Sequence, residues 1–102
     1  MDAIRFGTGG WRAVIGEDNL LFVPERKAEI ENVLTVEKRL PDFTDKVARV
    51  NYTDGCKVYL EDGGRAICRL SGTEPLLRIF AESNSRATAA GYIAAFKTFL
   101  DF

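Results

Sequence analysis

The chain has 102 residues, 46% of them hydrophobic and 11% aromatic, which is enough for one domain with a single core. Fourteen basic residues against fifteen acidic ones give a net charge of -1, which argues against general binding of nucleic acid or membrane surfaces. The start of the chain lacks the basic and then apolar pattern of a secretion signal, and no stretch approaches the roughly 20 apolar residues of a membrane span. We therefore expect a cytoplasmic protein with no membrane partner and no nucleic-acid partner.

Residues 4–16 read as a strand, a glycine-rich loop and a second strand, because apolar and polar residues alternate on both sides of the loop. The glycine spacing fits neither a dinucleotide-binding motif nor a P-loop. Residues 20–23 predict a short strand. Pro24 then suits the first turn of a helix over residues 25–39, whose apolar stripe faces a core and whose charged residues face water.

The second half of the chain predicts four strands and a closing helix. The strands cover residues 46–52, 56–61, 65–70 and 76–81, and turns at 53–55 and 62–64 make them an antiparallel meander. The helix follows capping residues at 83–85, with apolar residues at three- and four-residue spacing. The order β-α-β-β-β-β-α predicts an α+β fold, in which a four-stranded antiparallel sheet carries two helices on one face and follows an N-terminal β-loop-β segment.

The two cysteines, Cys56 and Cys68, lie on the two arms of the hairpin around residues 62–64. A two-residue turn would place them on opposite faces of the sheet, and only a three-residue loop would align them. In a cytosolic setting we expect two buried or half-buried thiols rather than a disulfide. The sequence has no histidine and no second cysteine pair, so zinc is not expected.

The stretch R-L-S-G-T-E-P at residues 69–75 is better explained by ligand chemistry than by folding. Arg69 offers a planar fork of five donors, Ser71 and Thr73 offer hydroxyls, and Gly72 lets backbone N–H groups approach an anion closely. A bare Ser-Gly-Thr triplet would be an ordinary turn between two strands. With arginine before it and Glu-Pro after it, the stretch predicts a cradle for an anion.

This motif resembles the phosphate-binding loop of the alpha-D-phosphohexomutases, the phosphoglucomutase and phosphomannomutase family, in their last domain. The resemblance implies that Arg69, Ser71, Gly72 and Thr73 contact the phosphate of a phosphosugar. Glu74 and Pro75 are then loop-shaping residues, and Leu70 replaces a frequent proline. The resemblance also implies a TATA-binding-protein-like fold for this domain.

Residues 6–12, F-G-T-G-G-W-R, resemble the opening loop F-G-T-x-G-x-R of the same family's first domain. Arg12 matches an arginine beside the family's active site, so it is a possible active-site remnant. In complete members several hundred residues separate the two loops, and here about sixty do. The resemblance therefore implies an internal deletion, natural or engineered, with residues 1–19 as a remnant of the first domain and 20–102 as the C-terminal phosphate-binding domain. We expect residues 1–19 to be removable without loss of the remaining fold.

The family reaction is an intramolecular phosphoryl transfer on hexose phosphates that uses magnesium and a phosphoserine. The histidine-containing serine loop has no counterpart, since Ser71 lies in the phosphate loop and Ser83 and Ser85 are helix caps. The metal and sugar-reading loops are also missing, and the turns at 53–55 and 61–64 offer only isolated acids. We expect no catalytic residue, no metal site, no cofactor of its own and no catalysis by this chain alone.

Three functional hypotheses follow. The leading one is a phosphate-binding C-terminal domain of a phosphoglucomutase/phosphomannomutase-like protein of carbohydrate metabolism. The alternative is a free-standing module that binds phosphosugar or phosphate, or that complements a separate partner. A third treats the open sheet face as a nucleic-acid platform with Tyr59 or Phe80 stacking on bases, which the near-neutral charge disfavours. Self-association through an exposed strand edge of the N-terminal segment is a further expectation.

Overall fold

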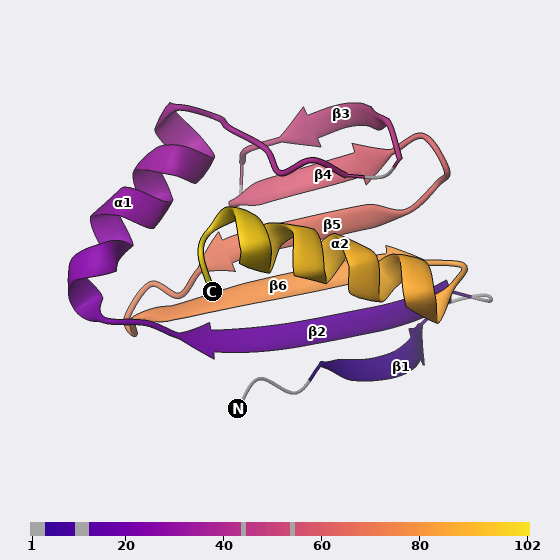
Figure 1. Cartoon of the computed structure of the whole chain (residues 1–102), viewed down its shortest axis with the longest axis horizontal. Coiled ribbons are helices and arrows are strands. Elements are labelled where there is room, and N and C mark those ends of the chain that lie inside the picture. The colour runs from indigo at the N-terminus through magenta and orange to yellow at the C-terminus, as the bar shows by residue number, and fades with distance from the viewer. Residues whose placement is uncertain (1–3, 10–12, 44, 54) are drawn as a thin grey trace.

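The computed structural model of the chain describes residues 4–9, 13–43, 45–53 and 55–102. One antiparallel sheet runs through the molecule in the strand order β1-β2-β6-β5-β4-β3, and two helical segments pack on it (Figure 1). The strands are β1 (Arg5–Gly9), β2 (Ala13–Leu21), β3 (Val47–Asn51), β4 (Cys56–Leu60), β5 (Arg65–Leu70) and β6 (Leu76–Ser83). The fold is α+β, as the order of elements predicts.

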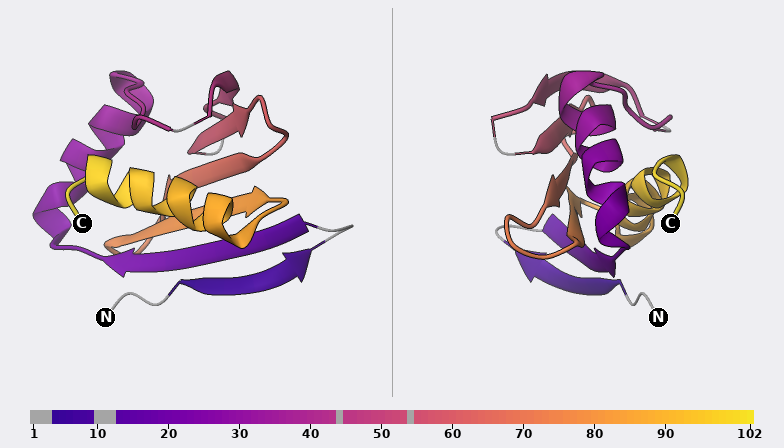
Figure 2. Two further views of the ribbon diagram at one scale, coloured as in Figure 1. Left: turned by 45° about the vertical axis from the view of Figure 1, so that its right-hand side comes forward. Right: turned by 90° about the vertical axis from the view of Figure 1, so that its left-hand side faces the viewer.

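The first helical segment begins where Pro24 predicts it. A 3-10 turn (Pro24–Arg26) leads into α1 (Lys27–Glu31), which continues as a wider π-helical turn (Asn32–Val36). The helix ends before the predicted residue 39, because Lys38 adopts a left-handed conformation with a φ of 55°. Ile30 and Leu34 are buried in the core, and the segment lies across one end of the sheet (Figure 2).

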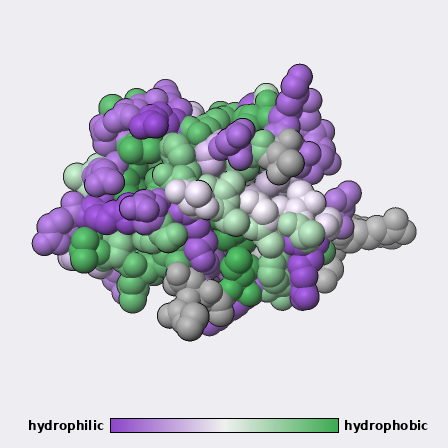
Figure 3. Space-filling view, viewed as in Figure 1, coloured by the Kyte–Doolittle hydropathy of each residue, from purple (hydrophilic) through white to green (hydrophobic). Residues whose placement is uncertain are grey.

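The second helix, α2 (Arg86–Phe99), covers the middle of the sheet. Ser85 caps it, since the Thr88 N–H donates to Ser85 Oγ at 3.4 Å. Buried and half-buried residues alternate along the strands; for example, Cys56, Val58 and Leu60 of β4 are buried and the residues between them are half-buried. From the helix side, hydrophilic side chains are prominent at the end of the molecule where α1 lies, with hydrophobic patches among them (Figure 3).

The prediction of a four-stranded sheet is wrong, because the N-terminal segment joins the same sheet through β1 and β2 and gives it six strands. The second strand predicted within residues 4–16 and the short strand predicted at 20–23 form one continuous strand, β2, which ends at Leu21. It pairs with β6 over eight residues, from Val14 opposite Ser83 to Leu21 opposite Leu76. The reason is that β6 has a free edge in the predicted meander, and a strand with a buried inner face can pair there.

The outermost strand β1 pairs with β2, so it forms one edge of the sheet, while β3 forms the other. The predicted domain boundary after residue 19 falls inside β2, and the two-part origin of the chain stays a prediction. Self-association through the N-terminal segment also stays a prediction.

The hairpin between β4 and β5 does not have a two-residue turn, which would have placed the two cysteines on opposite faces of the sheet. The Leu60 N–H donates to the Gly64 carbonyl at 2.9 Å, which closes a three-residue loop. This loop places Cys56 directly opposite Cys68 on the buried face. Both remain free thiols, as predicted.

Among the described residues, no helix lies on the face of the sheet opposite α2 (Figure 2). Alternation along the strands places six basic and two acidic side chains on this open face: Arg5, Arg49, Lys57, Arg65, Arg69, Arg78, Glu17 and Glu82. A face of such composition in a chain of net charge -1 concentrates positive potential on one side of the molecule. In the described part of the chain, no helix is both long and apolar enough to cross a membrane.

Candidate phosphate-binding site

Arg69 and Arg78 lie directly opposite each other on neighbouring strands of the open face. Arg69 is the next-to-last residue of β5, Arg78 is the third residue of β6, and their Cα atoms are register partners. Like charges directly opposite in a sheet repel each other. Two guanidinium groups side by side also offer several N–H donors to one phosphate-like group.

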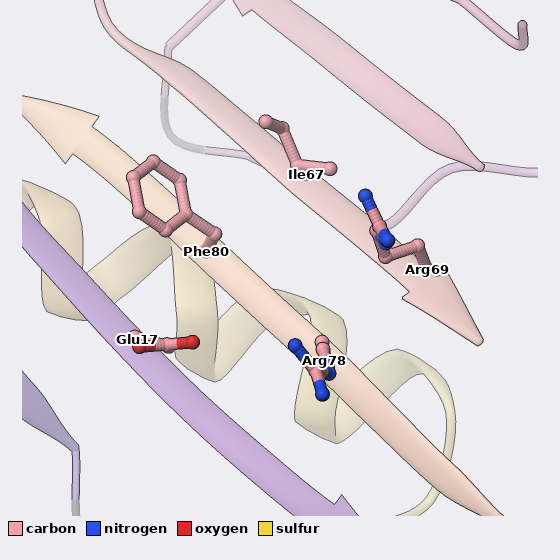
Figure 4. A pocket seen from close by; sticks show the side chains of 5 residues that line it. All are labelled: Glu17, Ile67, Arg69, Arg78 and Phe80. Atoms are coloured by element: carbon pink, nitrogen blue, oxygen red, sulfur yellow. The ribbon is translucent and has the colours of Figure 1, made fainter. Parts of the chain in front are cut away.

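The two arginines line one end of a surface cavity of about 270 Å³, together with Glu17, Ile67 and Phe80. Figure 4 shows all five side chains on the same side of strands β2, β6 and β5, with Arg78 between Glu17 and Arg69. The volume is close to the lower limit of ordinary small-molecule sites, about 300 Å³. The cavity therefore has the size and charge to hold a small anionic molecule.

The predicted phosphate loop, residues 71–75, connects β5 to β6 directly beside the two arginines. The Ser71 N–H donates to the Leu76 carbonyl at 2.8 Å, and the Phe22 N–H donates to the Pro75 carbonyl at 3.0 Å. These bonds hold the loop against β6 and the end of β2. Arg69 lines the cavity, whereas Ser71, Gly72 and Thr73 belong to the loop next to it and do not line it.

The Ser71 side chain organises the loop from within. Its Oγ accepts from the N–H groups of Thr73 and Glu74, each at 3.4 Å. A hydroxyl that accepts in this way still has its own proton to donate, so Ser71 can donate to an anion while shaping the turn. Gly72 and Thr73 are exposed to solvent.

Two glycines near the site, Gly72 and Gly55, differ in whether the fold requires glycine at their position. A side chain at Gly72 would meet nothing within 4 Å, so the packing of the fold does not require glycine there. Gly55, in the turn between β3 and β4, has a φ of +85°, and a Cβ there would lie 2.7 Å from Arg69 Cβ. This glycine therefore allows the turn to pack against the backbone of Arg69.

The basic side chains of the open face lower the pKa of Tyr59. A side-chain hydrogen bond from Lys57 lowers the pKa of Tyr59, and the charges of Lys57, Arg49 and Arg65 lower it further. The Arg49 guanidinium lies 3.9 Å from the centre of the Tyr59 ring. Basic and aromatic side chains thus alternate in space on this face, although they do not in sequence.

Four cavity residues were not predicted from sequence as phosphate-site residues: Glu17, Ile67, Arg78 and Phe80. The predicted pairing of residues 65–70 with 76–81 across the five-residue loop would place Leu77 opposite Arg69. The observed register, with Leu70 opposite Leu77, places Arg78 there instead. No local signal existed for Glu17, whose position depends on the pairing of β2 with β6.

The other predicted features are distributed as follows. Arg12, the possible active-site remnant, lies outside the described residues. Asp62 shapes its turn, since its Oδ1 accepts from the Gly64 N–H and its Oδ2 from the Tyr92 hydroxyl, at 2.8 and 2.7 Å. Over the ranges described, no three acidic or cysteine side chains converge in a way that could hold a metal ion.

Comparison with known proteins finds a matching family model and a relative. Residues 21–98 match the family model of the phosphoglucomutase/phosphomannomutase C-terminal domain, a range that includes the loop at 69–75 and both arginines. A phosphoglucomutase/phosphomannomutase from Thermococcus kodakarensis is 35% identical over 69 residues, which cover 68% of this chain and 14% of the relative. The chain thus corresponds to a small part of that relative's length. It belongs to the phosphoglucomutase/phosphomannomutase family and contains that family's C-terminal domain.

Proposed function

We propose that this chain binds the phosphate group of a phosphosugar on its open sheet face, between Arg69 and Arg78 and beside the loop at 71–75. The observation that carries the proposal is the direct opposition of these two arginines at one end of the 270 Å³ cavity. The phosphate accepts from both guanidinium groups and from the hydroxyls of Ser71 and Thr73. Glu74 and Pro75 keep the loop in shape.

The reaction that this binding serves is phosphoryl transfer between two positions of a hexose phosphate. The sequence of this chain has no histidine, and its three serines have other places: Ser71 lies in the phosphate loop, Ser83 ends β6 and Ser85 caps α2. We propose that the phosphoserine and the magnesium of the reaction belong to residues other than these 102. The role of the present residues is then to hold and orient the phosphate.

The affinity for inorganic phosphate alone is expected to be modest. Charge-assisted hydrogen bonds contribute about 1.5–3 kcal/mol each, but ordering and desolvation offset much of this for a small exposed ligand. We expect a Kd on the order of millimolar, about -4 kcal/mol. Binding weakens as salt is added, because the site is open to solvent.

The test is a titration of the isotope-labelled chain with inorganic phosphate, followed by amide chemical shifts. Shifts are expected at residues 69–73 and at Arg78, and both Arg69→Ala and Arg78→Ala should remove them. Arg49→Ala is the matched control, because it removes the same charge from the same face at the far edge strand β3. Binding that survives both site variants, or that Arg49→Ala weakens equally, would contradict the proposal.

A further inference from the structure

The cavity continues beyond the two arginines to three side chains of different chemistry. Glu17 on β2, Phe80 on β6 and Ile67 on β5 are register neighbours in one row across the sheet, and all three are half-buried. This row lies two residues along the strands from the row of Arg69 and Arg78, about 6.6 Å away at ordinary strand rise. One end of the cavity is therefore cationic, the middle is apolar, and the far side carries an acceptor.

We propose that this row binds the sugar ring of a hexose phosphate, with Glu17 as the residue that recognises its hydroxyls. The inference rests on the proposed phosphate site and extends it to the rest of the ligand. The ring lies with its apolar C–H face on Phe80 and Ile67. The Glu17 carboxylate accepts hydrogen bonds from two adjacent hydroxyls, which a carboxylate can do because it has two acceptor oxygens.

The arrangement matches a hexose phosphate in order as well as in chemistry. The phosphate carries the ligand's negative charge, and it sits at the end with two guanidinium groups. The hydroxyls are neutral donors, and they reach the end where the carboxylate of Glu17 lies. A flat apolar surface with a few polar groups at its margin is the usual form of a small-molecule site. An inorganic phosphate would leave this second row unused.

Glu17 lies outside residues 21–98, the range that matches the family's C-terminal domain. It enters the cavity only because β2 pairs with β6 and places Glu17 opposite Phe80. Recognition of the sugar by Glu17 therefore depends on the N-terminal segment of this chain. The segment would add selectivity to a site whose phosphate contacts come from β5, β6 and their loop.

The experiment compares three probes by amide chemical shifts: inorganic phosphate, cyclohexyl phosphate and glucose 1-phosphate. Cyclohexyl phosphate has a ring of similar size without hydroxyls. We expect glucose 1-phosphate to bind about tenfold more tightly than cyclohexyl phosphate, the effect of one to two hydrogen bonds to a carboxylate. Shifts at Glu17, Ile67 and Phe80 should appear with glucose 1-phosphate and not with inorganic phosphate.

Glu17→Ala should reduce the tenfold preference to about one while Arg69-dependent phosphate binding persists. Glu61→Gln, in the exposed turn between β4 and β5, is the control for loss of one negative charge. Glu17→Gln keeps the shape of the side chain and guards against a folding defect, and an intermediate preference is expected. The inference would be overturned if Glu17→Ala kept the preference for glucose 1-phosphate over cyclohexyl phosphate, or if the unsubstituted chain showed no such preference. Either result would leave the proposed phosphate site unaffected. Loss of all phosphate binding in the parent chain would instead refute the proposed function.

Discussion

Lys97 of α2 places its Nζ 3.0 Å from Oδ2 of Asp18 on β2, and this ion pair connects the N-terminal segment to the core. The Asp18 side chain is only 1% exposed, and that of Lys97 is 21% exposed. A charge as buried as Asp18 requires a partner, because desolvation of a carboxylate is costly. The pair thus makes β2 part of the same folding unit as α2.

Replacing Lys97 by Met should therefore destabilise the chain by about 3–5 kcal/mol, since the buried carboxylate loses its counter-charge. The double variant Asp18→Leu with Lys97→Met should regain most of that loss, because it leaves no buried charge. Urea denaturation gives the free energies of unfolding. Glu29→Ala is the comparison, because it breaks the exposed pair with Arg26 and should cost less than about 1 kcal/mol. A loss below 1 kcal/mol in Lys97→Met would show that the buried pair does not hold β2 in place.

Substitution of Gly55 should disturb the phosphate site without touching the ligand. Gly55→Ala adds a Cβ that meets Arg69 Cβ at 2.7 Å, so the turn or the end of β5 must shift. Gly63→Ala is a matched control, because Gly63 has a similar φ of +93° but open space around its Cβ. Both variants should lose about 1–3 kcal/mol of stability from backbone strain. Phosphate affinity should fall only in Gly55→Ala, and an equal fall in both would mean that contact with Arg69 is irrelevant.

Stability should decline at alkaline pH through the buried thiols. Burial raises the pKa of Cys56 to about 11, and burial together with the neighbouring Cys56 raises the pKa of Cys68. In the unfolded chain a thiol ionises near its ordinary pKa of about 8.5. The unfolded state therefore releases its thiol protons at a lower pH than the folded state does. The contribution of the thiols to the free energy of unfolding is complete below pH 8.5 and is lost as the pH rises toward 11.

For Cys56 the loss amounts to about 3 kcal/mol between these pH values. Denaturant unfolding at intervals from pH 7 to 11 measures it, and Cys56→Ala should show a shallower decline regardless of its starting stability. The Tyr92 pKa is also raised, by burial and by hydrogen bonds to Asp45 and Asp62, so Tyr92→Phe should flatten the curve above pH 10. Identical slopes in the parent chain and in both variants would exclude these groups as the cause.

The structure reverses the expectation that residues 1–19 are removable. Deletion of residues 1–19 removes most of β2, including the buried Asp18, and exposes the edge of β6 and one side of α2. We expect loss of cooperative thermal unfolding, measured by circular dichroism. Deletion of residues 1–12 removes β1 but keeps β2, and this shorter chain should still unfold cooperatively. An intact transition after removal of all nineteen residues would restore the original expectation.

The chain alone should not interconvert hexose phosphates. A coupled assay with magnesium, a hexose 1-phosphate and a bisphosphate activator tests this, with a complete family enzyme as the positive control. Turnover that scales with the concentration of this chain, survives further purification and disappears in Arg69→Ala would contradict the prediction. Turnover that appears only when a chain with the missing loops is added would favour the complementing module.

The sequence by itself determined which elements exist and where the anion-binding motif lies. Residues 65–70 form β5 as predicted, Pro24 starts the first helical segment and Ser85 caps α2, because alternation, helical spacing and capping act between residues close in the chain. The motif at 69–75 was recognisable for the same reason, since its donors are consecutive.

Only the tertiary structure decided how distant segments meet. It joined β2 to β6, placed Glu17 opposite Phe80 and brought Asp18 to Lys97, pairings that span more than fifty residues of sequence. The three-residue loop at 61–63 decided that Cys56 faces Cys68. Strand register sets such contacts, and a shift of one residue moves every side chain to the other face of the sheet. Local patterns do not contain that register between distant strands, so the apolar and acidic half of the cavity became visible only in the folded chain.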